Sequence, residues 1–136
     1  MTTVEVEDSI AAPLEKVWAL VSDFTGFVEA QGMTCKSQGE GIGMTRTIEL
    51  GGASITERLE ELDDGTHTTS YSIVESPLPV TGYQAWIAAS EASDGTTQIR
   101  WWSTFEPAGG DEAAVSDMIS GIYSSGIAGI KKALGA

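Results

Sequence analysis

The sequence has one cysteine, one histidine and few basic residues. Because Cys35 has no possible partner, no internal disulfide can form, and a reducing, cytoplasmic location is expected. Seven Lys and Arg residues stand against 20 Asp and Glu, which gives a formal net charge of −13. This charge argues against nucleic acid and anionic lipid as partners, because both are bound by clustered basic side chains. No apolar run reaches the roughly 18 residues of a membrane helix, so no membrane insertion is expected.

Motifs of metal and nucleophilic catalysis are also missing. The chain has no HExxH or CxxC motif and no Ser-His-Asp order, and one His with one Cys argues against a zinc site. The glycines at 39, 41 and 43 do not form the GxGxxG of a dinucleotide site and predict a hairpin turn instead. His67 is predicted to be a solvated neighbour of the turn at 63–65. We therefore expect no metal and no cofactor.

What is present indicates one globular domain over residues 1–136. Hydrophobic residues make up 41% of the chain, and 136 residues are enough for a sizeable core without metal or disulfide. Apolar periodicity predicts a strand over 4–10, a helix over 13–24 and a short second helix within 26–32. Alternation with recurrent turns predicts six strands over 33–106, and helical spacing returns at 111–134. The order indicates an antiparallel α+β domain.

The long C-terminal helix contains three glycines. Gly121, Gly126 and Gly129 each cost about 0.5–1 kcal/mol relative to Ala inside a helix. They therefore predict close backbone approach, a kink or tolerated mobility.

Turn chemistry predicts the register of the sheet. Loops at 63–65 and 93–95 place Glu57 opposite Tyr71 and Ile87 opposite Trp101, and a Gly52-Ala53 turn places Ile48 opposite Glu57. Opposed residues share a face. One face is thereby predicted to hold Arg46, Ile48, Leu50, Ile55, Glu57, Leu59, Tyr71 and Ile73. On the last hairpin the same rule groups Tyr83, Ala85, Ile87, Ile99, Trp101 and Phe105, and we expect the long helix to cover this mostly apolar side.

Arg46 and Glu57 are the charged members of the predicted inner face, placed diagonally on neighbouring strands. A charge in such a place is costly unless it is paired. In one interpretation Arg46 holds a ligand carboxylate or a developing enolate while Glu57 accepts a proton or hydrogen bond. In the other, the two form an internal ion pair that shapes a cavity floor.

Four aromatic residues have two interpretations each. Tyr71 and Tyr83 either present hydroxyls to a ligand or are strand aromatics with satisfied hydroxyls. Trp101 is expected to wall the cavity, with a plain core role as the alternative. Trp86 and Trp102 fall opposite each other on the outer face, where they predict a homodimer or partner interface unless neighbouring side chains cover them.

Four segments together resemble a known family. They are GMTRTI at 43–48, ITERLEELDD at 55–64, YSIVESPLPV at 71–80 and WWSTFEP at 101–107. The chain resembles bacterial SRPBCC proteins of the polyketide cyclase/dehydratase type, within the START-like helix-grip superfamily. The run 56–83 also resembles the plant abscisic acid receptors.

The resemblance implies a seven-stranded curved antiparallel sheet wrapped around the long C-terminal helix, with two short helices between strands 1 and 2 and a ligand cavity inside. Positions that line the receptors' cavity match Ile48, Leu50, Glu57, Tyr71, Tyr83, Ala85, Met118 and Ile122. With Arg46, Ile73 and Trp101 from the predicted inner face, these form the expected ligand-binding set. The turn at 50–53 is shorter than the receptors' gate and Leu78-Pro79-Val80 replaces their latch, so a gated receptor mechanism is not expected.

Three functions follow. The first is binding of a small hydrophobic or aromatic ligand, polyketide- or lipid-like. The second is a cofactor-free cyclase or aromatase, with Arg46 polarising a carbonyl, Glu57 moving the proton and Tyr71 or Tyr83 holding the substrate. The third is a protein-interaction module that uses the Trp86/Trp102 face. A cavity with one buried charge pair and few other polar groups would favour the first.

Overall fold

The computed structural model describes residues 1–50 and 52–136, without the side chain of Leu50. Within those residues the chain forms seven strands and three helices. In chain order they are β1 (Thr2–Ile10), α1 (Leu14–Val21), α2 (Gly26–Glu29), β2 (Thr34–Gln38), β3 (Thr45–Leu50), β4 (Ala53–Asp63), β5 (Thr68–Glu75), β6 (Val80–Glu91), β7 (Thr97–Pro107) and α3 (Glu112–Leu134). The predicted α+β order, with two short helices after the first strand, is confirmed.

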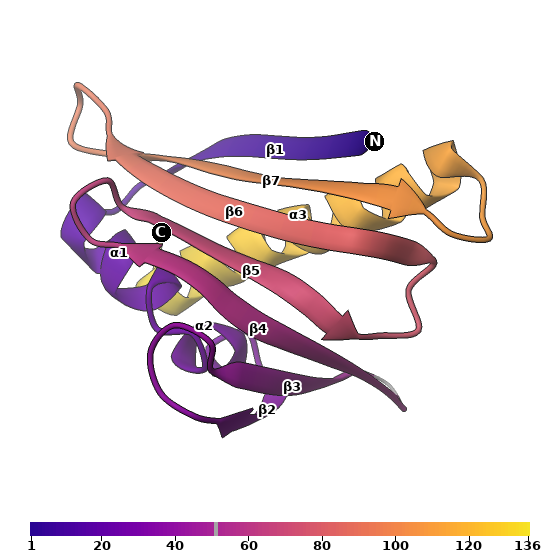
Figure 1. Cartoon of the computed structure of the whole chain (residues 1–136). Helices are drawn as coiled ribbons and strands as arrows, with labels where there is room; N and C mark the ends of the chain where they lie inside the picture. Colours follow the sequence, from indigo (N-terminus) through magenta and orange to yellow (C-terminus); the bar gives the residue numbers. More distant parts are fainter. Residues whose placement is uncertain (51) are drawn as a thin grey trace.

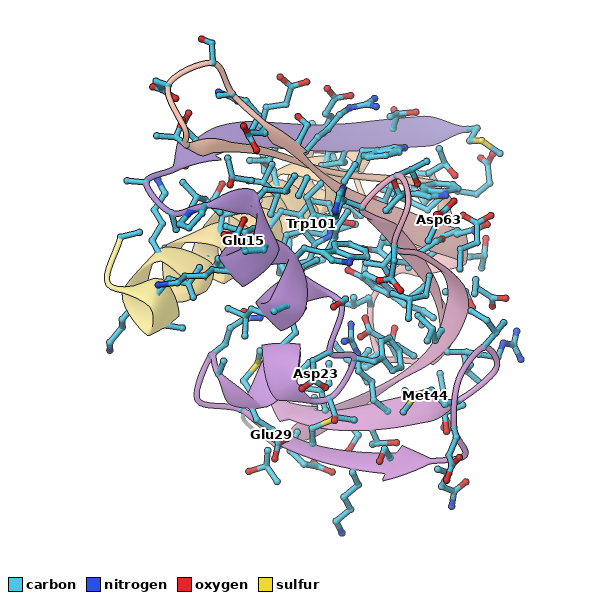
Figure 2. The ribbon with its side chains drawn as sticks, turned by 90° about the vertical axis from the view of Figure 1, so that its left-hand side faces the viewer. Glu15, Asp23, Glu29, Met44, Asp63 and Trp101 are labelled. Atoms are coloured by element: carbon cyan, nitrogen blue, oxygen red, sulfur yellow. The ribbon has the colours of Figure 1, made fainter. Side chains whose placement is uncertain are left out.

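The strands form one antiparallel sheet in the order β1-β7-β6-β5-β4-β3-β2. The sheet curls along this order, and the helices lie on its concave side (Figure 1 and Figure 2). The long helix α3 packs mainly against β1 and β7. It therefore covers one part of the concave face, while the part formed by β3, β4 and β5 faces α2 and the flank of α3. No helix in the described part of the chain is long and apolar enough to cross a membrane.

The core lies between α3, α1 and the concave face of the sheet. From α3 it receives side chains at helical spacing, and each apolar one contributes about 1.5–3 kcal/mol on full burial. These are Val115, Ile119, Tyr123, Ile127 and Ile130. Met118 and Ile122, from the same predicted stripe, remain 39% and 41% exposed. Figure 2 shows Trp101 in the interior, between the sheet and the helices.

Two of the three helix glycines mark close contacts. A Cβ at Gly126 would lie 2.5 Å from Cζ3 of Trp101, and one at Gly129 would lie 2.9 Å from Cγ of Gln31. A Cβ at Gly121 would meet no atom within 4 Å. Of the three predicted explanations, close backbone approach is therefore confirmed at the first two positions and does not apply to Gly121.

The register of the β6–β7 hairpin matches the prediction from Gln84 to its loop, with Ile87 opposite Trp101 and Ala85 opposite Ser103. A register shift between Thr81 and Gln84 interrupts the pairing where Tyr83 was expected opposite Phe105. The β3–β4 register differs from the prediction by two residues. Arg46 pairs with Glu57 and Ile48 with Ile55, so the predicted diagonal placement of the charges and the predicted Ile48–Glu57 pair are wrong. The connection between β3 and β4 includes residue 51, which lies outside the described residues.

The β4–β5 register was also predicted wrongly, yet the faces are right. The loop between these strands is longer than the expected three residues, so Leu59 rather than Glu57 lies opposite Tyr71, and Glu57 lies opposite Ile73. A register shift between Leu59 and Glu61 accompanies the longer loop. An extra residue on one strand restores the side-chain alternation that a one-residue slip would invert. The inner face therefore keeps its predicted members among the described side chains, which do not include that of Leu50.

The convex face carries the two paired tryptophans. Trp86 and Trp102 lie opposite each other on β6 and β7, with ring centroids 5.8 Å apart and ring planes 11° apart. The Arg100 guanidinium lies 4.0 Å from the Trp102 ring, and its Nη2 donates to Glu5 at 2.8 Å. Both indoles are half-buried because they cover each other and Arg100 covers one of them.

Candidate functional site

A cavity of about 490 Å³ lies between the concave face of the sheet, α2 with its following loop, and the flank of α3. This size lies within the roughly 300–1,000 Å³ of small-molecule sites. The wall is mostly apolar. It combines residues of α2 and its following loop with residues of β3 to β7, the β5–β6 loop and α3. It consists of Phe27, Val28, Gln31, Met33, Arg46, Ile48, Ile55, Glu57, Tyr71, Ile73, Leu78, Tyr83, Trp101, Met118, Ile119, Gly121, Ile122 and Ser125.

Most of the predicted ligand-binding set lies in this wall. The members in place are Arg46, Ile48, Glu57, Tyr71, Ile73, Tyr83, Trp101, Met118 and Ile122. Ala85 is fully buried within the core and does not line the cavity. The side chain of Leu50 lies outside the described residues.

Arg46 and Glu57 form a buried ion pair on neighbouring strands. Arg46 Nε donates to Glu57 Oε1 at 2.8 Å, and the two side chains are 4% and 10% exposed. The direct β3–β4 pairing of the two residues sets this contact. The pair is a charge-assisted hydrogen bond made through one nitrogen and one oxygen.

Further contacts fix the guanidinium of Arg46. Its Nη1 donates to the backbone carbonyl of Phe24 at 2.5 Å. Its Cζ lies 3.9 Å from the centroid of the Phe24 ring and 5.0 Å from that of Tyr71. The segment after α1 thus orients the guanidinium at the cavity wall, and the side chain has little freedom to turn away from Glu57.

The hydroxyls of the three tyrosines are held by other aromatic side chains. Trp101 Nε1 donates to the Tyr71 hydroxyl at 3.1 Å, and the hydroxyls of Tyr83 and Tyr123 hydrogen-bond each other. Burial raises the pKa of all three phenols, and for Tyr71 and Tyr83 neighbouring phenols and the Glu57 carboxylate raise the pKa further. Each tyrosine is therefore a neutral hydrogen-bonding group near neutral pH.

Part of the wall was not predicted from the sequence. It comprises Phe27, Val28, Gln31, Met33, Leu78, Ile119, Gly121 and Ser125, together with Ile55, which was placed on the inner face but not in the ligand set. Most of these residues lie in or just after the short helix α2, or on one flank of α3. Tyr123 shows the same difficulty, because helical spacing identifies it as core and gives no sign of its bond to Tyr83.

The histidine and the cysteine of the sequence do not line the cavity. His67 sits in the β4–β5 loop, where its ring packs edge-on against Trp18 at 5.5 Å, rather than being freely solvated as predicted. Cys35 is half-buried on β2, and burial raises the pKa of its thiol. Within residues 1–50 and 52–136, no three His, Cys, Asp or Glu side chains gather closely enough to hold a metal ion.

Two solved structures of bacterial proteins are similar to this chain over nearly its full length. The chain is similar over 98% of its length to the protein XoxI from Bacillus cereus, with 28% identity, 95% of that chain covered and a TM-score of 0.89. An uncharacterised protein from Bacillus thuringiensis shares 27% identity, with 97% and 98% of the two chains covered and a TM-score of 0.88. A search of curated proteins found no match.

A more distant structure shares the fold alone. Norcoclaurine synthase from Thalictrum flavum, solved with dopamine and hydroxybenzaldehyde, is 14% identical, with a TM-score of 0.77 over 98% of this chain and 86% of the enzyme. The family profile described as polyketide cyclase / dehydrase and lipid transport matches residues 1–135. The chain therefore belongs to this family, which is part of the SRPBCC superfamily of helix-grip folds.

Proposed function

We propose that this protein binds a small hydrophobic or aromatic molecule, polyketide- or lipid-like, in the cavity between the sheet and α3. The main support is the cavity itself, about 490 Å³ with a mostly apolar wall and one buried ion pair. A mostly apolar pocket with a few placed polar groups is the usual form of a small-molecule site. The family description, which includes lipid transport, agrees with this role.

Binding has more support than catalysis because the wall offers few groups able to move a proton. General acid–base catalysis works best with a pKa near the operating pH. The pKa values of Tyr71 and Tyr83 are raised by burial, and their hydroxyls are engaged with Trp101 and Tyr123. Glu57 is held by Arg46. The polar groups are thus suited to orienting a ligand.

A cyclase or aromatase is the second candidate. It is favoured by the family description and by the position of Arg46 and Glu57 in the cavity wall, where a substrate carbonyl could meet both. The bound dopamine and hydroxybenzaldehyde of norcoclaurine synthase support small aromatic ligands for this fold in general. Turnover of a poly-β-ketone analogue that is lost in Glu57→Gln would establish an enzyme, and absence of turnover would leave the binding role.

The binding role can be tested with an uncharged fluorescent probe such as aminoanthracene. Ile48→Trp directs a large side chain from β3 into the cavity, whereas Glu49→Trp adds the same side chain to the exposed outer face of that strand. We expect Ile48→Trp to weaken probe binding at least about tenfold, a loss of ~1.4 kcal/mol, and Glu49→Trp to leave it unchanged. Equal affinities in the two variants, or no binding to the unmodified protein, would contradict the proposal.

A protein-interaction role is the third candidate, and it includes a homodimer. It is favoured by the stacked Trp86 and Trp102 indoles on the convex face, which lies on the opposite side of the sheet from the helices (Figure 1). If this face joins two copies, Trp102→Glu should halve the mass measured by sedimentation. A monomer mass in both the unmodified protein and the variant would remove the homodimer.

A further inference from the structure

We propose that the cavity selects an uncharged ligand that carries a hydroxyl group close to a carbonyl group, and that it rejects the corresponding carboxylate. This inference depends on the proposed binding function and specifies the chemistry of the ligand's polar end. It follows from the two atoms of the Arg46–Glu57 pair that the protein leaves unused.

The ion pair uses only part of each side chain. Arg46 bonds through Nε to Glu57 Oε1 and through Nη1 to the Phe24 carbonyl. In the described part of the chain, Arg46 Nη2 and Glu57 Oε2 make no hydrogen bond, and the one fully enclosed side-chain atom without a partner is Ser103 Oγ. The two atoms therefore keep some accessible surface. We place this surface at the cavity, because both residues line it.

The unused atoms have opposite hydrogen-bonding roles. Nη2 is a donor and Oε2 of the carboxylate is an acceptor. Since the two side chains are joined by a 2.8 Å contact, a ligand that bonds both must carry its acceptor and its donor near each other. A carbonyl oxygen accepts from Nη2 and a nearby hydroxyl donates to Oε2. Hydroxy ketones whose two groups cannot hydrogen-bond each other, such as phenols with an acyl group at the meta position, have this arrangement.

The charge balance disfavours a carboxylate. Among the wall residues of the described chain, Arg46 and Glu57 are the charged ones, so the wall is neutral overall. A ligand carboxylate would bring an uncompensated negative charge next to Glu57 Oε2, and an unpaired buried charge is strongly unfavourable. The guanidinium cannot turn fully toward such a ligand, because it is packed against the rings of Phe24 and Tyr71. The interpretation in which Arg46 holds a ligand carboxylate is therefore disfavoured.

The rest of the wall specifies an apolar skeleton. Beyond the ion pair the cavity presents mainly aliphatic and aromatic side chains, such as Ile48, Ile55, Ile73 and Trp101. The hydroxyls of Tyr71 and Tyr83 already have partners. A flat or compact hydrocarbon with one hydroxyl–carbonyl pair at its end matches this distribution of polar and apolar surface.

Three naphthalene probes and aminoanthracene test the inference on the unmodified protein by fluorescence displacement. Hydroxyacetonaphthone, with its two groups at meta positions of one ring so that they cannot hydrogen-bond each other, should bind about tenfold more tightly than acetonaphthone because it adds a hydrogen bond to a charged acceptor. The matching hydroxynaphthoate should bind at least about tenfold more weakly than hydroxyacetonaphthone. Equal or tighter binding of the naphthoate would overturn the inference, as would equal binding of the two ketones.

Glu57→Gln provides a second test, because it keeps the shape of the side chain and removes its charge. The remaining charge of Arg46 should then raise the affinity for hydroxynaphthoate about tenfold or more, while hydroxyacetonaphthone loses less than about tenfold. Tyr83→Phe, which changes a wall residue without changing charge, should leave the ratio of the two affinities unaltered. A Glu57→Gln protein that folds and keeps the original ratio would contradict the inference.

The outcomes separate this inference from the function on which it depends. If aminoanthracene and acetonaphthone bind but the hydroxyl gives no gain or the carboxylate is preferred, the ligand class is wrong and the binding role stands. If none of the four probes binds, both are wrong. The comparison on the unmodified protein decides the matter even if Glu57→Gln does not fold.

Discussion

At the scale of single residues, the ion pair of Arg46 and Glu57 places two charges in a wall that is otherwise mostly apolar. Each charge is tolerated because the other compensates it. Removing one partner leaves the other buried and unpaired, whereas removing both leaves an apolar wall. The two situations have different stabilities, so the pair can be examined with a double-mutant cycle.

We expect Arg46→Met to lower the free energy of unfolding by about 3 kcal/mol, near the lower end of the range for broken buried pairs because the cavity gives the remaining charge some access to water. The double variant Arg46→Met/Glu57→Leu should recover most of this loss, because no charge remains uncompensated. Urea denaturation of Arg46→Met, Glu57→Leu and the double variant measures the loss in free energy of unfolding for each. A double variant whose loss equals the sum of the single losses would mean that the two residues do not compensate each other.

Which residues share the inner face could be predicted from the sequence, but their distances could not. Side chains alternate with period two along a strand, so a register error of two residues leaves Arg46, Glu57 and Tyr71 on the correct face. The same error decides whether Arg46 and Glu57 are diagonal or directly opposed. That depends on the length of the β3–β4 connection, which glycine-rich loops leave ambiguous. The β4–β5 irregularity, which sets the partners of Tyr71, likewise has no clear signal in the sequence.

At the scale of elements, α3 combines a buried stripe with a flank that borders the cavity. Helical periodicity identifies the stripe, and it also assigns Met118 and Ile122 to the apolar face. It does not predict that the helix lies toward β1 and β7. Nor does it predict that this position leaves the two side chains at the cavity. The short helix α2 has the same limitation, because four residues are too few for a periodic pattern. The position of a helix over a sheet depends on packing between distant segments.

The glycines of α3 allow a matched comparison within one helix. At Gly126 an added Cβ would lie 2.5 Å from the Trp101 ring, whereas at Gly121 it would meet nothing within 4 Å. Gly121→Ala should therefore stabilise the protein by about 0.5–1 kcal/mol through helix propensity alone. Gly126→Ala should destabilise it by about 1–3 kcal/mol, because Trp101 or α3 must shift.

Thermal and urea unfolding of the two alanine variants measure these changes. The helix propensity of alanine is common to both, so the difference between them isolates the contact with Trp101. If both substitutions stabilise the protein to the same extent, the close approach of α3 to Trp101 is not present in solution.

At the scale of the whole molecule, most charged side chains lie on the surface, whereas the polar groups of the interior are few. The net charge of −13 belongs mostly to exposed side chains, including the acidic partners of Arg100 and Lys131. The interior holds one ion pair and the three tyrosines of the sequence, all of them buried. Because burial raises the pKa of each phenol, the folded state as a whole resists ionisation at alkaline pH.

The raised pKa values predict that the protein unfolds at alkaline pH as its tyrosines ionise. A phenol is neutral when protonated, so a folded-state pKa above the value of about 10 in the unfolded chain means that the unfolded state releases protons first. The contribution of the tyrosines to stability is therefore full below about pH 10 and is lost as the pH rises toward the folded-state pKa values. Tyrosinate absorbance should stay low past pH 10 and then rise for all three residues together, in step with the loss of circular dichroism.

The unfolded chain in urea supplies the reference, because its tyrosines should titrate near pH 10. Tyr123→Phe removes one of the three phenols and should reduce by about one the number of protons released on unfolding in this pH range, which lowers the slope of stability against pH. Ionisation of one or more tyrosines near pH 10 in a protein that keeps its circular dichroism would contradict the prediction. Such a result would mean that water reaches the hydroxyls of Tyr71, Tyr83 or Tyr123 through the cavity, and the cavity would then be larger and wetter than the contacts of its wall indicate.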